Sequence, residues 1–378
     1  MKFSLKITLL LAITSSALYA QQSKTINLET AEKTAFYLTT AKGADLQGSN
    51  SIHALRFNEV STDKGRFVNL SANGLFKSYD PGKPGLPVIS KLLEVPVGAD
   101  IEVKVISYDE EVIKLTDRGI ENLICPAQPS EAKCDNGEPK EFRLDSSIYN
   151  TNAFYSKKLI DVEDRGILRY KRLANLRISP FQYNPVENTL KIINNIEYEI
   201  SFVGGDSKRA NKLREIYKNP YFSSLAENVI VNTTSTGKSK ELIDDEPVTY
   251  VIVSDPMFKE QLQPFVQWKK LKGFNVIEAY TDVIGGTKEE IKTYLQDLYE
   301  NPPLTPPSFV LFVGDVEQIP AWSGTTDSHV TDLYYCEYTG DDLPEVYYGR
   351  FSAQTTEQLQ PQIDKTLQIA LEEIDEGE

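Results

Sequence analysis

The sequence predicts an α+β protein in which an N-terminal all-β, sandwich-like domain precedes part of an α/β subdomain with a doubly wound parallel sheet. From about residue 50 to 203, apolar residues alternate with polar ones, as in IEYEISF, which is typical of half-buried antiparallel strands. After residue 248, continuous apolar runs alternate with stretches of helical periodicity, which indicates parallel strands covered by helices. A chain of 378 residues is long enough to give both units a core.

The first twenty residues have the layout of a secretory signal peptide. Lys2 and Lys6 precede an apolar stretch from about Ile7 to Ile13, and small residues follow as far as Ala20. This stretch is too short to span a bilayer, and we predict no transmembrane segment elsewhere in the chain. We therefore expect residues 1–20 to be removed and the protein to be exported from a bacterial cell, to the cell surface or beyond it.

Residues 21–231 are predicted to form the β-rich domain. DIEVKVISY, ILRYKRLANLRI and IEYEISF are each taken as a strand, and the turn sequence YNPVENT at 183–189 predicts a hairpin. We expect no helix of consequence among these strands, and a helix within residues 204–230, where charged and apolar residues mix.

Residues 232–247, NTTSTGKSKELIDDEP, are predicted to be a linker. The segment lacks the apolar residues that would offset the entropy lost when it is ordered. It also carries Lys238 and Lys240, which makes it a candidate for proteolytic cleavage. We predict a cut between about Asn232 and Glu246.

Residues 248–378 are predicted to form the α/β subdomain, beginning with the strand VTYVIVSD. Asp255 then caps a helix that is expected to continue to Gly273 with a kink at Pro264. FNVIEAY is the second predicted strand. Thr287 with Glu290 has the spacing of a capping box for the next helix.

Two further strands, SFVLFVGD and EVYYGRFS, precede a closing helix in TTEQLQPQIDKTLQIALEEI. Ligands of open α/β sheets bind beyond the carboxyl ends of the strands, so Asp255 and Asp315 would lie on the rim of one crevice. The alternative is that each carboxylate only caps the turn or helix that follows it. Arg350, at another strand end, can pair with such a carboxylate.

The succession YVIVSD, FVQWKKLKGFNV, FVLFVGDVEQIP and TDLYYCEYTGDDLPEVYYGRFS resembles the first part of the catalytic domain of gingipain-like cysteine peptidases. PGKPGLPVISKLLEVPVGADIEVKV and LRISPFQYNPVENTLKIINNIEYEISF resemble the propeptide that precedes that domain. The resemblance covers about residues 65 to 372. It implies a secreted bacterial cysteine endopeptidase that acts on proteins or peptides and is made as an inactive precursor, with a caspase-like α/β fold. The propeptide domain would cover the crevice until the linker is cut.

The resemblance also implies a Cys–His dyad, with the histidine in a His-Gly turn and the cysteine after the next strand. A thiolate needs a neighbouring imidazolium or a helix terminus to form at neutral pH. No residue of the sequence matches either motif, so the dyad is expected beyond Glu378 and this chain alone is expected to be inactive. His329 and Cys336 lack the flanking strand and turn and are not expected to be catalytic, and His53 is expected to be structural.

The acidic loop that spans residues 327–342 is the candidate metal site. Clustered carboxylates are hard ligands that can bind calcium, and members of the resembled family are known as calcium-binding proteins. A solvated loop with no bound ion is the alternative. The candidate ligands are Asp327, Asp332, Glu337, Asp341 and Asp342. A structural calcium ion is therefore possible, and no cofactor is expected to be required.

Charge and cysteine content narrow the function further. The net charge of −15 argues against nucleic acid as a partner, because phosphate backbones require clustered lysine and arginine. Two histidines in the whole chain exclude a multi-histidine zinc site. Cys125 and Cys134 enclose a short loop and can pair, which would stabilise the fold by roughly 2–3 kcal/mol. Cys336 is then predicted to be a small buried apolar residue.

Two other functions are compatible with the same architecture. One is a non-catalytic exported protein that binds a partner at the cell surface or during secretion, because fold does not fix function. The other is a sortase-like processing peptidase of the same superfamily.

Overall fold

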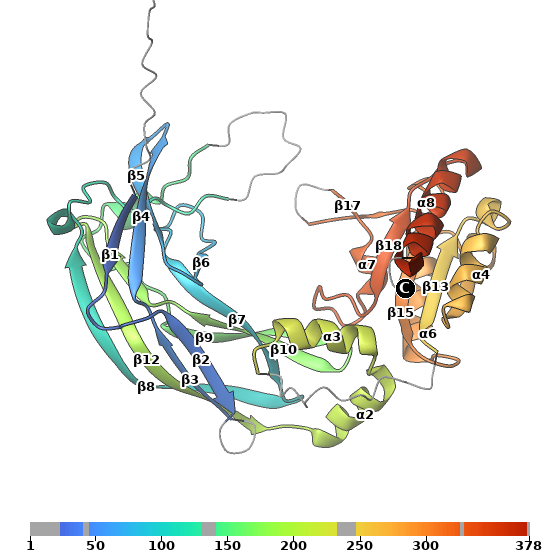
Figure 1. Ribbon diagram of the computed structural model, residues 1–378, viewed down its shortest axis with the longest axis horizontal. Coiled ribbons are helices and arrows are strands. Elements are labelled where there is room, and N and C mark those ends of the chain that lie inside the picture. Colours follow the sequence, from blue (N-terminus) through green and yellow to red (C-terminus); the bar gives the residue numbers. More distant parts are fainter. Residues whose placement is uncertain (1–22, 41–44, 130–140, 233–246, 326–328, 376–378) are drawn as a thin grey trace, which may run out of the picture.

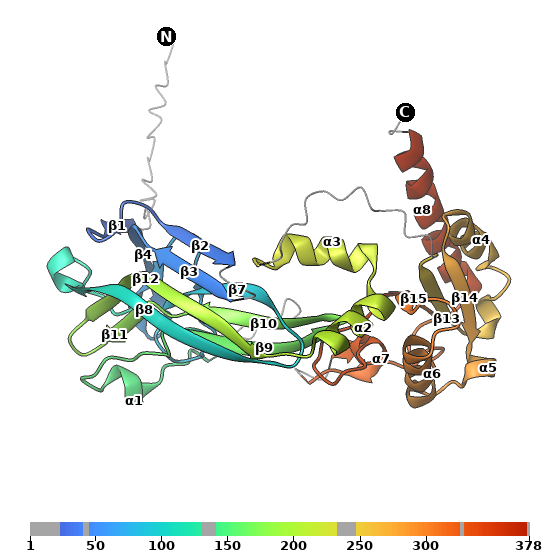
Figure 2. The same ribbon diagram turned by 90° about the horizontal axis from the view of Figure 1, so that it is seen from below.

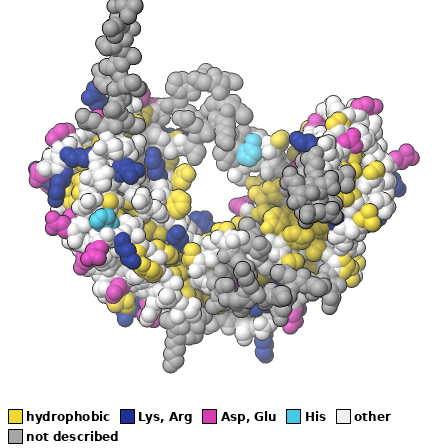
Figure 3. All heavy atoms as spheres, in the orientation of Figure 1, with side chains coloured by type: hydrophobic (Ala, Val, Ile, Leu, Met, Phe, Trp, Pro, Cys, Tyr) yellow, Lys and Arg dark blue, Asp and Glu magenta, His cyan; other side chains and the backbone are white. Residues whose placement is uncertain are grey.

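The computed structural model describes residues 23–40, 45–129, 141–232, 247–325 and 329–375, and these form a β-rich domain and an α/β subdomain that meet at one end (Figure 1). The predicted α+β class is confirmed. The space-filling view shows the two bodies in contact along one side and a hollow between them on the other (Figure 3). The predicted signal peptide, residues 1–20, and nearly all of the predicted linker, 232–247, lie outside the described residues.

The β-rich domain contains three antiparallel sheets, as the period of two predicts. One has the order β1 (Ser23–Asn27), β4 (Ala54–Thr62), β5 (Gly65–Ser71). Another has the order β6 (Phe76–Lys77), β7 (Pro87–Val95), β10 (Lys171–Ile178), β9 (Ile160–Leu168). The third has the order β11 (Phe181–Asn184), β12 (Thr189–Gly204), β3 (Leu46–Ser51), β2 (Ala35–Thr40), and β8 (Ala99–Lys114) also pairs with β12.

Strand β12 shows how alternation builds this core. Ile196, Tyr198 and Ile200 are at most 1% exposed and pack in one cluster with residues of β7 and β10, while Glu197 between them is exposed. The predicted hairpin at residues 183–189 is confirmed by the antiparallel pairing of β11 with β12. Apolar packing between sheets therefore determines which face of each strand is buried.

The segment ILRYKRLANLRI is not one strand, and that prediction is wrong. Strand β9 ends at Leu168 and β10 begins at Lys171, so Arg169 and Tyr170 form a tight turn between two paired strands. Arg169 has a left-handed backbone with φ of 59°, which an arginine seldom adopts. Neither Arg169 nor Tyr170 is one of the glycine, asparagine or proline residues that usually mark such a turn.

The helices before the linker follow the prediction closely. The strands are interrupted only by η1 (Thr116–Arg118) and the short helix α1 (Ser146–Tyr149) in the described part of the domain. The predicted helical region 204–230 contains two helices, α2 (Ser207–Tyr217) and α3 (Pro220–Val229). Asp206 caps α2 by accepting a hydrogen bond from the Arg209 amide. The two helices lie between the domains (Figure 2).

The α/β subdomain has a parallel four-stranded sheet with the order β14 (Asn275–Tyr280), β13 (Thr249–Ser254), β15 (Pro307–Val313), β18 (Tyr347–Phe351). One face packs against α4 (Gln263–Leu271) and α8 (Thr356–Asp375). The other packs against α6 (Lys288–Glu300) and α7 (Leu333–Cys336). The remaining elements are η2 (Pro256–Phe258), α5 (Thr281–Ile284), β16 (Trp322–Ser323) and β17 (Val330–Thr331). All six residues of β13 are buried, which explains its continuous apolar sequence.

The predicted kink at Pro264 is wrong, because the helix begins there instead of bending. After η2 the chain turns, and α4 starts at Gln263 with Pro264 in its first turn. The missing proline N–H has no cost at that position, since first-turn amides have no partner within the helix. Gly273 follows α4 with φ of 88°, as expected for a glycine that ends a helix.

The predicted capping box of α6 is confirmed. The Thr287 hydroxyl accepts a hydrogen bond from the Glu290 amide, and the Glu290 carboxylate accepts one from the Thr287 amide. The buried face of the helix carries Ile291, Leu295 and Tyr299 against the sheet.

Substituting Thr287→Ala should lower the free energy of unfolding of the α/β subdomain by about 1 kcal/mol, because the Glu290 amide loses its hydroxyl acceptor and the Glu290 carboxylate loses the hydroxyl donor. Both tryptophans of the chain, Trp268 and Trp322, belong to this subdomain, so their fluorescence during urea titration reports its unfolding. Thr293→Ala, in the interior of the same helix, is the control and should be neutral or slightly stabilising. An equal loss of unfolding free energy in Thr287→Ala and Thr293→Ala would show that the capping box does not stabilise the subdomain.

Candidate functional site

The carboxyl ends of the parallel strands form the edge where a ligand crevice is expected. Strands β13, β15 and β18 end at Ser254, Val313 and Phe351, and the loops that follow them carry the predicted rim residues. Asp255 follows β13 directly, and Asp315 follows β15 after Gly314. The structure therefore places both carboxylates at the same edge of the sheet, and their place on the rim of a crevice remains a prediction.

Asp315 connects the loops that follow two neighbouring strands. Its carboxylate accepts hydrogen bonds from the Val316 amide at 2.9 Å, the Ser352 hydroxyl at 3.1 Å and the Gln354 side-chain amide at 3.0 Å. The Asp315 amide also donates to the Ala353 carbonyl oxygen at 2.9 Å. The carboxylate thus fixes the start of the loop after β15 against the segment that follows β18.

These hydrogen bonds determine the protonation of Asp315. The bond from the Val316 amide, followed by those from Ser352 and Gln354, holds the pKa of the Asp315 carboxyl below its usual value of 3.8. A carboxylate with three donors and a low pKa is a structural anchor, because it stays ionised and does not accept a proton at neutral pH. No role as a general base follows from this geometry.

Asp255 acts as a cap. Its carboxylate accepts a hydrogen bond from the Met257 amide at 2.8 Å, at the start of η2. Capping, which was the alternative to a direct role in the crevice, accounts for this contact.

Arg350 pairs with Asp332 and not with either rim carboxylate. The guanidinium donates to the two carboxylate oxygens of Asp332, from Nε at 2.9 Å and from Nη2 at 2.6 Å. Its Nη1 donates to the carbonyl oxygens of Gly314 and Ile319, each at 2.9 Å. Arg350 therefore joins strand β18, the loop after β15 and the loop before α7 into one rigid unit.

The candidate calcium ligands do not converge among the described residues. Asp332 is paired with Arg350, and Asp341 accepts a hydrogen bond from the Ile167 amide of the β-rich domain at 2.7 Å. Glu337 accepts from the Asp341 amide at 3.2 Å, and Asp342 is exposed with a left-handed backbone. Asp327 lies outside the described residues, which contain no group of three or more His, Cys, Asp or Glu side chains suited to a metal. The described part of the set does not fit calcium, and calcium binding remains an untested prediction.

The cysteines and histidines of the described chain do not form a dyad. Cys336 is fully buried against the sheet, and burial raises the pKa of its thiol well above the usual range. His329 is exposed in the loop before β17, and His53 lies in the β-rich domain with its Nδ1 2.7 Å from the Ala31 carbonyl oxygen. Cys125 is buried, and burial raises its pKa as well. Cys134 lies outside the described residues, so its pairing with Cys125 remains a prediction.

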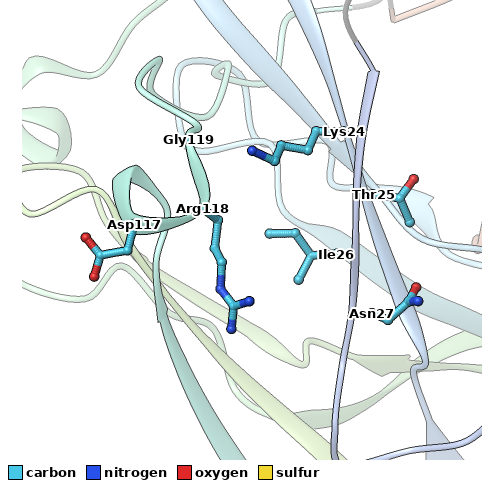
Figure 4. A pocket seen from close by; sticks show the side chains of 7 residues that line it. All are labelled: Lys24, Thr25, Ile26, Asn27, Asp117, Arg118 and Gly119. Atoms are coloured by element: carbon cyan, nitrogen blue, oxygen red, sulfur yellow. The ribbon is translucent and has the colours of Figure 1, made fainter.

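A surface cavity of about 480 Å³ lies in the β-rich domain, between β1 and η1. Lys24 and Arg118 extend into it, while Asp117 points away (Figure 4). No cysteine or histidine lines this cavity, and the carboxyl edge of the parallel sheet remains the candidate site.

Comparison with known families identifies the architecture. The family described as Propeptide_C25 matches residues 49–240, just over half of the chain, and the family described as Peptidase family C25 matches residues 243–376. The chain belongs to the C25 peptidase family. The boundary between the two matches falls within the predicted linker.

Relatives in Porphyromonas gingivalis agree with this assignment. Lys-gingipain HG66 is 35% identical over 368 residues, which cover 96% of this chain and 21% of the relative. Gingipain R2 of strain W83 is 28% identical over 319 residues, covering 83% of this chain and 41% of the relative. A solved structure described as an insight into the zymogenic latency of gingipain K aligns with a TM-score of 0.46 and 36% identity, over 49% of this chain and 100% of that one. The chain spans about a fifth of the length of the Lys-gingipains.

Two functional contacts were missed by sequence reasoning. The pairing of Arg350 with Asp332 joins residues 18 apart through a loop without periodicity, although the position of Arg350 at a strand end was a usable signal. The burial of Arg169 between the domains had no signal, because its segment resembles an ordinary strand.

Asp315→Asn should destabilise the α/β subdomain at pH 7 and have a smaller effect as the pH falls below 3.8. The pKa of Asp315 is lowered in the folded state, so its contribution is present above the unfolded pKa and is lost as the pH falls through the folded pKa. Unfolding free energies of the wild type and Asp315→Asn, measured by urea titration at pH 7 and at a pH below 3.8, test this pH dependence. Glu317→Gln, at an exposed position in the same loop, is the control. A destabilisation that does not change with pH would contradict the assignment.

Asp332→Ala should lower the unfolding free energy by about 3 kcal/mol, because it leaves the Arg350 charge without its carboxylate. The two side chains are only 15% and 14% exposed, so water cannot replace the lost partner. Asp342→Asn, at an exposed left-handed position that asparagine tolerates, is the matched control and should be nearly neutral. A similar loss of unfolding free energy in Asp332→Ala and Asp342→Asn would contradict a structural role for the pair of Asp332 with Arg350.

Proposed function

We propose that this chain is the front part of an exported cysteine endopeptidase precursor, with a propeptide domain that keeps the peptidase domain latent. The observation that carries the proposal is the presence, in one chain, of a C25 propeptide domain docked on the first part of a C25 peptidase domain. Because the chain spans about a fifth of its Lys-gingipain relatives, the activity belongs to a longer protein.

The catalytic thiolate is expected to come from outside the described residues. Cys125 and Cys336 are buried thiols with raised pKa values, so neither supplies an accessible nucleophile. The His-Gly turn and catalytic cysteine that the family resemblance implies are expected beyond Glu378. There an imidazole would take the thiol proton and later donate it to the leaving amine. The described residues contribute the rim: Asp315 and Arg350 hold the loops after β15 and β18 in position.

The location of the protein is part of the proposal. The lysines, apolar stretch and small residues of positions 1–20 support export by a signal peptide. Among the described residues, the structure contains no helix long and apolar enough to cross a membrane.

The predicted cover over the crevice by the propeptide domain remains a proposal. The hydrogen bonds described between the two domains involve five residues of the α/β subdomain that lie at or before the amino ends of the strands: Pro307, Ser308, Asp341, Glu345 and Tyr347. Latency thus needs at least a stable attachment at this edge, whatever covers the crevice.

The test is to express the full native reading frame and assay cleavage of lysine and arginine peptides before and after processing. We expect a latent precursor that becomes active after a cut between Asn232 and Glu246, and activity that a thiol alkylator abolishes. The new amino terminus can be located by mass spectrometry. The control is Cys336→Ala, which should keep activity and its sensitivity to alkylation, since this thiol is buried in the core.

Two results would contradict the proposal. One is a reading frame without a cysteine after the expected strand, which would favour the non-catalytic binding protein. The other is a mature amino terminus within the strands of the β-rich domain.

A further inference from the structure

The turn between β9 and β10 carries a charged side chain into the space between the two domains. Arg169, at the tip, is 3% exposed and has the left-handed backbone described above. A left-handed arginine is unfavourable, and a buried guanidinium requires partners for its N–H groups. The contacts of the Arg169 side chain must therefore offset both the unfavourable backbone conformation and the burial of the charge.

Three backbone carbonyl oxygens accept hydrogen bonds from the Arg169 guanidinium. Nε donates to Tyr217 at 2.9 Å, and Nη1 donates to Pro307 at 2.8 Å and to Glu345 at 2.9 Å. The guanidinium carbon also lies 4.9 Å from the ring centre of Phe222 and 5.5 Å from that of Tyr299. Pro307 begins β15 and Glu345 precedes β18, so the guanidinium binds at the amino ends of the sheet.

A second part of the propeptide domain binds at the same edge. The elbow, which we define as residues 217–222 from the end of α2 to the start of α3, places three aromatic rings on the α/β subdomain. Tyr217 stacks on Tyr299 with ring centres 4.7 Å apart, Tyr221 meets Phe309 edge-on at 4.9 Å, and Phe222 meets Tyr347 at 4.4 Å. The Asn219 side-chain amide donates to the Ser308 hydroxyl at 2.8 Å in a buried setting.

The hairpin makes a close backbone approach beside Arg169. Asp341 accepts a hydrogen bond from the Ile167 amide at 2.7 Å, and a side chain at Gly166 would collide with the Asp341 carboxylate. The φ of 107° at Gly166 is likewise suited to glycine. The hairpin between β9 and β10 therefore fits closely against the α/β subdomain over several residues. We call the Pro307, Glu345 and Tyr299 groups that contact it the receptor.

We propose that Arg169 and the elbow form a latch that keeps the propeptide domain bound to the α/β subdomain after the linker has been cut, from the edge opposite the crevice. Both parts of the latch precede residue 232, and the Pro307, Glu345 and Tyr299 groups that receive them follow residue 247. Cutting between these positions breaks no contact of the latch. Release then requires withdrawal of a buried guanidinium from carbonyl oxygens, so the latch sets the lifetime of the cut complex.

This inference rests on the proposed function but is tested without peptidase activity. A specific protease site is inserted within residues 233–246 of the 378-residue chain, the chain is cut, and dissociation of the two fragments is followed by size-exclusion chromatography and surface plasmon resonance. The wild-type fragments should elute together. Arg169→Met should speed dissociation at least tenfold, because the carbonyl oxygens lose their donor. The dissociation rate of Arg169→Lys should lie between those of the wild type and Arg169→Met, since an ammonium lacks the fork geometry of a guanidinium.

The matched control is Arg165→Ala on the same hairpin. Arg165 is exposed and pairs with Glu163 of its own domain at 3.0 Å, so its loss should leave dissociation unchanged. Tyr221→Ala is a second latch variant at a side chain that is 45% exposed, where folding should be preserved even if Arg169→Met disturbs it. Far-UV circular dichroism of the uncut variants verifies folding, because both tryptophans belong to the α/β subdomain and do not report on the domain that carries the substitutions.

The latch is overturned if the wild-type fragments separate as soon as the linker is cut. It is also overturned if folded Arg169→Met and Tyr221→Ala fragments dissociate at the wild-type rate. Either result would leave the proposed peptidase precursor standing, whereas an inactive full-length protein with intact fragment binding would refute the precursor and leave the latch.

Discussion

The arrangement of this protein depends on one buried charge, the guanidinium of Arg169. Burial of a charge is unfavourable unless its hydrogen-bonding groups are satisfied, and Arg169 is 3% exposed. The carbonyl oxygens that satisfy it come from three separate segments, at Tyr217, Pro307 and Glu345. The hairpin, the elbow and the amino edge of the sheet must therefore be together for the side chain to be stable. Satisfying one group in this way fixes the position of one domain on the other.

In a parallel sheet, all carboxyl ends of the strands lie at one edge and all amino ends at the opposite edge. Binding of the propeptide domain can therefore occur at a different edge from the candidate ligand crevice. Loops that follow the carboxyl ends of the strands build ligand sites, and here they are held by Asp315 and by the pair of Arg350 with Asp332. The amino edge has no such role and is available to hold the propeptide domain. Attachment can thus be strong without altering the geometry of the loops at the crevice.

The sequence was sufficient wherever local physical chemistry decides the structure. Alternation along IEYEISF predicted the buried face of β12, and the Thr287–Glu290 spacing predicted the start of α6. It failed where tertiary contacts decide. The turn at Arg169 is stabilised by the other domain, Pro264 begins a helix because the chain turns before it, and Asp332 finds its partner across a loop. Rim carboxylates could be located at strand ends, but their hydrogen-bond partners could not.

The central claim is that the propeptide domain is held at the amino edge of the sheet, and amide hydrogen exchange before and after separation of the cut fragments tests it most directly. Residues 307–309 and 343–347 contain or adjoin the receptor of the latch, while residues 314–320 form the loop at the carboxyl edge. The account predicts faster exchange in the first two segments after separation and unchanged exchange in the third. Faster exchange confined to residues 314–320 would contradict it.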